Sequence, residues 1–187
     1  MLELTAVRHG ETTFNAAGLL TGRRDPPLNA RGREQARALA PLLRAHWDVV
    51  AHSGARRARD TLALASAAAG AAVPAPRADP RWLERGFGDL EGRPAGTWRQ
   101  PADVDAAPPG GESYRTLGLR VHAALADVAQ AGPGRVLLVA HSGVLRMLGG
   151  IASGAETLAP LLAEGPRPGE AVVLRYASIE LPPFLAN

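Results

Sequence analysis

The sequence predicts an α/β fold, a single three-layer α/β/α domain with a mainly parallel central sheet. Apolar runs of strand length alternate with longer segments of helical periodicity, which is typical of parallel strands joined by helices. The 187 residues suit one ordinary domain, which we place over residues 1–187. An apolar content of 46% with 21% charged residues is that of a soluble globular chain.

The expected elements follow the apolar periodicity. In order they are a strand at 2–7, a helix at 30–45, a strand at 47–51, a helix at 56–69, an edge strand at 73–77, a helix at 113–131, a strand at 135–140, a helix at 144–152, and closing strands at 170–176 and 178–181. Pro74 and Pro76 restrict their strand to a sheet edge, because proline cannot donate to a ladder. Residues 86–111 are rich in glycine and proline, so we expect an irregular excursion there.

The composition excludes several classes of protein. No apolar run reaches the roughly 18 residues of a membrane span, and the chain starts without a basic segment or a small-residue cleavage site, so we expect a cytoplasmic protein with no membrane partner. The absence of cysteine excludes disulfides, thiolate metal sites and a cysteine nucleophile. The sequence pI of about 10.4 reflects arginine chemistry, because the net charge is only +3. With basic residues dispersed among acids and 4% aromatics, no nucleic-acid partner is expected.

Two histidines are expected at the same edge of this sheet. His9 comes at the end of the first strand, and His141 at the end of the strand at 135–140. Ligands of an open parallel sheet collect just beyond the carboxyl ends of its strands. Gly10 and Gly143 follow within two residues, which lets the backbone turn tightly and point its amides into the crevice. Two histidines in matching positions indicate a functional pair.

Arginines beside the histidines indicate a phosphate ligand. Arg8 is adjacent to His9, and Arg57 lies where a strand ends and a helix begins. A guanidinium offers a phosphoryl group planar, bidentate geometry that lysine cannot match, and a helix start also favours an anion. Arg56 is instead expected to be solvated or paired with Asp60. These residues predict phosphoryl chemistry at the carboxyl edge of the sheet.

Phosphoryl transfer from an ester also needs a general acid, because the leaving alkoxide must be protonated as the P–O bond breaks. Glu84 is our choice, since Leu83 and Phe87 provide an apolar wall, and such surroundings favour the neutral form of a carboxyl group. The competing carboxylates are Asp89, Glu91 and Glu112.

These residues resemble a known family, the histidine phosphatase (phosphoglycerate-mutase-like) superfamily. The matching motifs occupy residues 8–12 with Asn15, 20–28, 32–36, 57–61, 83–84, 87–92, 109–113 and 141–146. An Arg-His-Gly triplet alone is a weak signal, whereas all these motifs in order are highly specific. The residues after Gly149 lie beyond what the motifs inform.

The resemblance implies a phosphohistidine mechanism, with His9 as the nucleophile, Glu84 as proton donor and later acceptor, and His141 as a second catalytic histidine. The substrate-binding residues that it implies are Arg8, Arg57, Asn15, Thr21, Gly22 and Ser142. The chain departs from the family pattern at Gly54-Ala55, where proline and a larger apolar residue are frequent, and at Ser142, where a second glycine is common. Neither departure removes a catalytic group.

Several alternatives stay open or are ranked low. A metal site is disfavoured because no local His-x-x-x-His pair exists, and no cofactor is expected. A phospho-ligand binding module that had lost its activity would be expected to lack one of four residues that the reaction needs. All four are present: His9, Arg57, Glu84 and His141. If the chain is an enzyme, its expected partner is a small-molecule phosphate ester, and a homodimer is left open. The motifs do not distinguish an α-ribazole phosphatase from a phosphatase of broad specificity.

Hydrolysis is favoured over mutase chemistry by the stretch between Gly92 and Gly110. A mutase must shield its bisphosphate intermediate from water and bind the second charged group of its substrate. This stretch is short and rich in proline, and its only arginines are Arg93 and Arg99. We therefore expect a phosphatase whose phosphohistidine is open to water.

Overall fold

The computed structural model describes residues 1–99, 103–132 and 134–186, so Pro101 of the expected excursion lies outside the described residues. In chain order the helices and strands are β1 (Leu2–Arg8), α1 (Thr13–Ala16), α2 (Ala30–Ala38), α3 (Ala40–Leu43), β2 (Val49–His52), α4 (Arg56–Ala69), β3 (Arg77–Ala78), α5 (Tyr114–Gln130), β4 (Arg135–Ala140), α6 (Ser142–Ala152), α7 (Ala159–Leu162), β5 (Ala171–Tyr176) and α8 (Pro183–Ala186). Short 3₁₀ turns occupy Pro80–Trp82, Gly88–Leu90 and Ala95–Thr97.

The five strands form one sheet in the order β3-β2-β4-β1-β5. All neighbouring pairs are parallel except β1 with β5, so the sheet is mainly parallel as predicted. Strands β1 and β4 lie side by side, with Arg8 opposite Ala140. The residues that follow these two strands, His9 and His141, therefore emerge next to each other.

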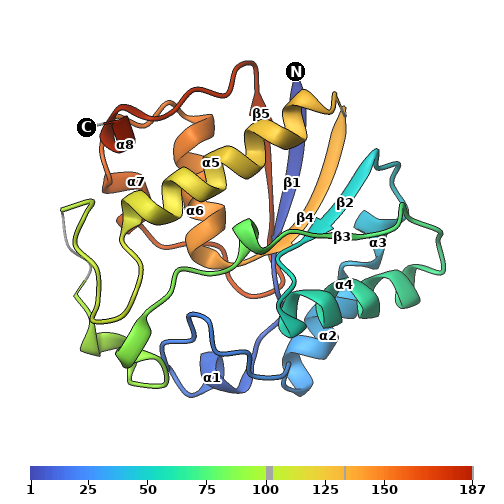
Figure 1. Cartoon of the computed structure of the whole chain (residues 1–187). Coiled ribbons are helices and arrows are strands. Elements are labelled where there is room, and N and C mark those ends of the chain that lie inside the picture. The colour runs from blue at the N-terminus through green and yellow to red at the C-terminus, as the bar shows by residue number, and fades with distance from the viewer. Residues whose placement is uncertain (100–102, 133, 187) are drawn as a thin grey trace.

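Helices cover both faces of the sheet, which gives the three predicted layers (Figure 1). Strand β4 shows how the sequence specifies this arrangement, because its side chains alternate between the faces. Val136 and Leu138 join the apolar cluster under α5 and α6, whereas Leu137 and Val139 join the cluster under α2, α3 and α4. A strand buried on both faces reads as a continuous apolar run, which is why β4 was predicted with correct bounds.

The helix expected at 30–45 is wrong as a single element. It divides at Leu39 into α2 and α3. Pro41 has no N–H and cannot donate to the carbonyl of residue 37, and the backbone tightens into three-residue turns here. The amide of Leu39 donates to the carbonyl of Ala36 at 3.2 Å, and that of Leu42 to the carbonyl of Leu39 at 2.9 Å.

Two expected strands also differ from the structure. The stretch 73–77 pairs with β2 only from Arg77 onward, because the prolines before it cannot donate to the ladder. The stretch 178–181 is irregular. Ile179 and Leu181 pack against the apolar cluster under α5 and α6, so this short run buries its side chains without joining the sheet.

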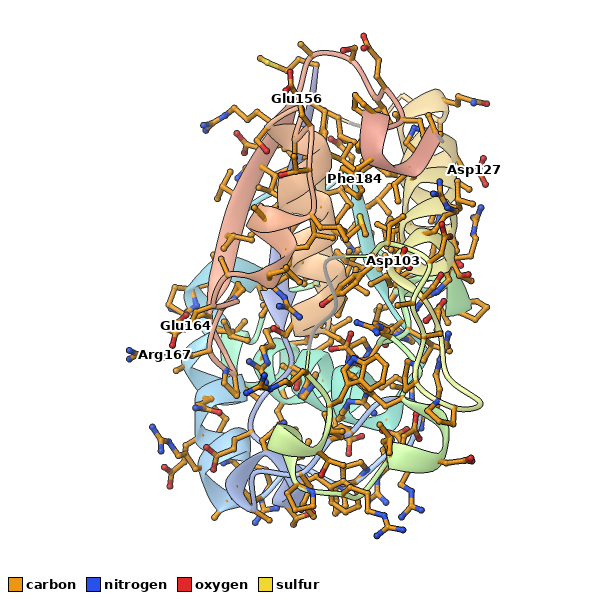
Figure 2. All side chains as sticks on the ribbon, turned by 90° about the vertical axis from the view of Figure 1, so that its left-hand side faces the viewer. Asp103, Asp127, Glu156, Glu164, Arg167 and Phe184 are labelled. Carbon is orange, nitrogen blue, oxygen red and sulfur yellow. The ribbon has the colours of Figure 1, made fainter. Side chains whose placement is uncertain are left out.

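The carboxyl ends of the parallel strands lie at the lower edge of the sheet in Figure 1, beside α1 and the irregular segment that follows β3. The segment between α7 and β5 also reaches this edge, since the amide of Gly169 donates to the carbonyl of Arg8 at 3.0 Å. Glu164 and Arg167 of that segment lie at the surface (Figure 2). Among the described residues, no helix combines the length and apolarity needed to cross a membrane.

Candidate functional site: two buried histidines and an arginine cradle

The two histidines that follow β1 and β4 face each other at the carboxyl edge of the sheet. His9 is 3% exposed and His141 is fully buried, and their ring centroids lie 5.1 Å apart in an edge-on arrangement. The amide of His9 donates to the carbonyl of Ala140 at 3.1 Å, which extends the pairing of β1 and β4 to the histidine itself. The predicted pair of histidines is therefore brought together by adjacent parallel strands.

The hydrogen bond of the His9 ring identifies which nitrogen carries the lone pair. Nδ1 lies 2.8 Å from the carbonyl oxygen of Gly10, and a carbonyl can only accept, so Nδ1 is protonated. Burial first, and then the positive charge of Arg57, lower the pKa of His9 from 6.5 to about 3. The ring is therefore neutral at pH 7, and Nε2 presents an unprotonated lone pair.

The second histidine is held by a serine. Nε2 of His141 lies 2.8 Å from Oγ of the fully buried Ser53, which follows β2. Ser53 Oγ also accepts from the amide of Ala55 at 3.3 Å. Burial, and then the charge of Arg57, hold the pKa of His141 well below its ordinary value, so this ring is neutral as well.

Arg57 is the best-anchored cation of the site. It is the second residue of α4, and its side chain is only 1% exposed. Its Nη1 donates to the carbonyl of Arg24 at 2.8 Å and to Oδ1 of Asp25 at 3.0 Å, and its Nη2 donates to the carbonyl of Gly22 at 3.0 Å. Its Nε donates to Nε2 of His9 at 3.3 Å. These bonds leave one Nη2 hydrogen beside the Nε–H, so the guanidinium edge with two donors faces the lone pair of His9.

Arg8 supplies the second cation. Its Nη1 donates to the carbonyl of Pro166 at 2.8 Å, while its buried Nε has no hydrogen-bond partner among the described residues. Burial lowers the pKa of both Arg8 and Arg57, and the Glu84 carboxylate opposes this shift in each. The three side chains are thus close enough to act on one another electrostatically.

Glu84 lies against the start of α6, the helix that follows His141. Its Oε2 accepts from the amide of Gly143 at 3.2 Å, and its Oε1 accepts from the amide of Arg85 at 2.8 Å. The surroundings of this carboxylate are more polar than the expected apolar wall, because two amides donate to it and the positive charges of Arg8 and Arg57 act on it. The sequence does not show this, since Gly143 is 59 residues from Glu84.

The competing carboxylates have other contacts. Glu91 accepts the amides of Arg23, Arg24 and Phe87 at 2.8, 3.0 and 3.0 Å. Glu112 forms an ion pair with Arg120 at 2.6 Å. Asp89 is exposed. Of the four carboxylates considered, Glu84 is therefore the one that binds the helix start after His141 and acts on both Arg8 and Arg57.

The remaining predicted substrate-binding residues are placed unequally. The Thr21 hydroxyl is buried without a partner among the described residues, and the Gly22 carbonyl holds Arg57. Ser142 is half-buried at the first turn of α6, next to His141. Asn15 forms a capping box with Thr12 at the start of α1, and among the described residues no hydrogen bond joins it to the histidines, so its substrate role stays a prediction.

Buried polar atoms without partners mark where a ligand fits. Such atoms are uncommon in folded proteins, and each costs about 1–3 kcal/mol unless a ligand or water satisfies it. Three of them belong to predicted site residues: Nε of Arg8, Oγ1 of Thr21 and Nδ1 of His141. The Nε–H of Arg8 suits an anionic acceptor, and Nδ1 of His141 does so in the tautomer that has its hydrogen on this nitrogen. Among the described residues, no group of three or more histidine or carboxylate side chains could hold a metal ion.

Sequence reasoning missed three supporting residues. Ser53 binds His141 as described. Thr61 accepts from the amide of Gly10 at 3.0 Å and donates to the carbonyl of Arg57 at 2.7 Å, which ties the turn after β1 to α4. Asp25 forms an ion pair with Arg57 at 3.0 Å. The need of a buried arginine for a carboxylate partner was the signal that could have identified Asp25.

Comparisons with known proteins agree with this geometry. The family model described as "Histidine phosphatase superfamily (branch 1)" matches residues 4–177. The chain is 37% identical over 155 residues to "Probable phosphoglycerate mutase GpmB" of Enterobacter sp. (strain 638), covering 75% of this chain and 70% of that protein. Mycobacterial glucosyl-3-phosphoglycerate phosphatase, in a structure that "complexes with VO3", has a TM-score of 0.80 at 27% identity, with 94% and 93% of the two chains covered. The α-ribazole phosphatase from Shigella flexneri has a TM-score of 0.78 at 29% identity, with 92% and 89% covered. The predicted resemblance is confirmed, and the chain belongs to the histidine phosphatase superfamily, branch 1.

Proposed function

We propose that this chain is a phosphomonoesterase that hydrolyses small phosphate monoesters through a phosphohistidine on His9. One observation carries the proposal. The ring of His9 donates from Nδ1 to the carbonyl of Gly10, so the lone pair on Nε2 points toward the two-donor edge of Arg57. This arrangement supports His9 as the nucleophile and Arg57 as the cation that binds the transferred phosphoryl group.

In the first step, the Nε–H of Arg57 shifts from Nε2 of His9 to a phosphoryl oxygen. The freed lone pair of Nε2 attacks phosphorus, and the P–O bond breaks with its electron pair going to the leaving oxygen. The Nε–H and Nη2–H of Arg57, together with Nε–H of Arg8, bind the phosphoryl oxygens in the geometry that guanidinium groups favour. Ser53 Oγ–H donates to Nε2 of His141, which leaves the hydrogen of this neutral ring on Nδ1 to donate to a phosphoryl oxygen.

Glu84 moves the proton in both steps. The negative charge of a bound phosphate favours the protonated carboxyl group, which gives its proton to the leaving oxygen. Water then attacks phosphorus, Glu84 takes the proton from that water, and the P–N bond breaks to return the lone pair to His9. Atoms and charges balance over the cycle without a cofactor.

The surroundings of this reaction are also proposals. We assign residues 1–187 to one domain and place the enzyme in the cytoplasm, with a small phosphate ester as its partner, no nucleic-acid partner and a homodimer left open. The identity to a probable mutase makes phosphoglycerate mutase the second candidate. We favour hydrolysis because Arg93 and Arg99, the arginines of the short stretch over residues 93–109, are both exposed.

A direct competition between the two reactions tests the proposal. The chain is given 3-phosphoglycerate with catalytic 2,3-bisphosphoglycerate, and formation of 2-phosphoglycerate is compared with phosphate release from a panel of simple monoesters. Faster phosphate release supports a phosphatase. Isomerisation much faster than any hydrolysis would replace the proposal with a mutase. If neither reaction is observed, a phospho-ligand binding module becomes the better interpretation.

A further inference from the structure

The guanidinium group of Arg120, on α5, has all five of its N–H donors engaged. Nη1 donates to the carbonyl of Arg81 at 2.6 Å and to that of Leu83 at 2.7 Å, and Nη2 donates to the carbonyl of Glu84 at 3.2 Å. The remaining donors bind Glu112, with Nε to Oε1 at 2.6 Å and Nη2 to Oε2 at 2.8 Å. One side chain therefore gathers three carbonyls from the four residues that end at Glu84.

Glu112 completes this arrangement from the other side of the same segment. Its Oε2 accepts from the amide of Gly86 at 3.1 Å, and its own amide donates to the carbonyl of Gly86 at 2.9 Å. Its carbonyl accepts from Nε of Arg85 at 2.8 Å. The Arg120 and Glu112 side chains are only 15% and 10% exposed. Burial raises the pKa of Glu112, but the hydrogen bonds from Arg120 outweigh this effect and the pKa lies below its ordinary value.

The segment 81–86 thus has backbone anchors on both sides of Glu84. Its start is held further by the Arg81 side chain, which reaches Asp127 on the outer side of α5 at 2.6 Å (Figure 2). Within the part of the chain that the structure describes, the Glu84 side chain is held by two amides, those of Gly143 and Arg85. The position of this carboxylate relative to His141 therefore depends on where its backbone is fixed.

We propose that Arg120, paired with Glu112, is a positioning residue that holds the proton donor Glu84 at the leaving oxygen. The inference rests on the proposed function. Among the described residues Arg120 has no hydrogen bond to either histidine, although its positive charge contributes to the low pKa of His141. We infer that it acts on Glu84 through the carbonyls of Arg81, Leu83 and Glu84. Lysine cannot replace it, because an ammonium has three donors and no planar fork that could bind carbonyls and a carboxylate together.

The test is the leaving-group dependence of Arg120→Lys. Proton donation matters for a poor leaving group such as the alkoxide of an alkyl phosphate, and much less for p-nitrophenolate. Because a misplaced catalytic group can cost on the order of 10²-fold, the ratio of kcat/KM for glycerol phosphate to that for p-nitrophenyl phosphate should fall by at least about tenfold. Glu84→Gln should lower the same ratio. The double variant should lower it no further than Glu84→Gln alone, since both changes remove one proton donor.

Arg115→Lys is the matched control, because Arg115 lies on the same helix but binds Asp105 and the carbonyl of Leu185. It should leave the alkyl-to-aryl ratio within about twofold of wild type, since surface ion pairs contribute little. Glu112→Gln, which keeps the side-chain shape, should lower the ratio and serves if Arg120→Lys does not fold.

An equal loss on both substrates in Arg120→Lys and Glu112→Gln would overturn the inference, because it would mean a general structural role. The proposed function would still stand if wild type hydrolyses both esters and Glu84→Gln is selective for the alkyl ester. If wild type hydrolyses neither ester, the proposed function fails and the inference fails with it.

Discussion

Lowering the pH from about 8 to about 5 is expected to destabilise the fold through its two buried site histidines. Each has a folded-state pKa below the ordinary 6.5, with His9 at about 3. The unfolded chain therefore binds protons that the folded chain does not, and stability is complete above pH 6.5 and is lost as the pH falls toward 3. At about pH 5 the loss of unfolding free energy per histidine depends on the pKa of histidine in the unfolded chain and amounts to about 2 kcal/mol.

Urea denaturation of wild type and His9→Gln at both pH values measures this effect. The loss of unfolding free energy between about pH 8 and pH 5 should be smaller in His9→Gln by about 2 kcal/mol, because glutamine does not titrate. Val139→Ala is the control, since it removes buried apolar contacts without a titrating group and should lower stability equally at both pH values. An unchanged pH dependence in His9→Gln would refute the argument that the fold holds His9 neutral.

Two further predictions concern the residues around the histidines. Arg57→Lys should lower kcat/KM on the order of 10²-fold, because the point charge of lysine cannot replace the two-donor edge of the guanidinium. Arg56, whose side chain is 60% exposed, is the control, and Arg56→Lys should keep kcat/KM within about twofold of wild type. Equal losses in steady-state kinetics would mean that the wrong arginine was chosen. Ser53→Ala should lower kcat/KM about tenfold, by releasing His141, and Ser53→Thr should restore part of the activity through its hydroxyl; wild-type kinetics in Ser53→Ala would remove Ser53 from the site.

The fold was predictable where burial left a periodic signal in the sequence. Helix α4 and strand β4 were predicted with the observed bounds, because one has a long alanine-rich period and the other is buried on both faces. The prediction of a single helix at 30–45 was wrong near Pro41, because apolar periodicity carries no information on the hydrogen bond that a proline removes. The strand at 178–181 failed because a short apolar run can bury its side chains without pairing, and the choice depends on whether a free strand edge is within reach.

The site was predictable to the extent that strand order brings residues together. His9, Arg8 and His141 follow from two parallel strands, and the Arg57 prediction used the start of α4. Contacts that form only in three dimensions were not visible, as with Ser53, which is 88 residues from His141 in the sequence. The polar surroundings of Glu84 were not predicted for the same reason, since its amide partner on α6 is 59 residues away in the sequence.

Chemical trapping of the covalent intermediate tests the central claim most directly. Wild type and His9→Ala are mixed with a ³²P-labelled phosphomonoester, quenched in alkali, and divided between acid and alkaline incubation. Phosphohistidine is labile in acid and stable in alkali, so we predict a protein-bound label that acid removes, present in wild type and absent from His9→Ala. A label that survives acid, or that persists in His9→Ala, would contradict the assignment of His9 as the nucleophile.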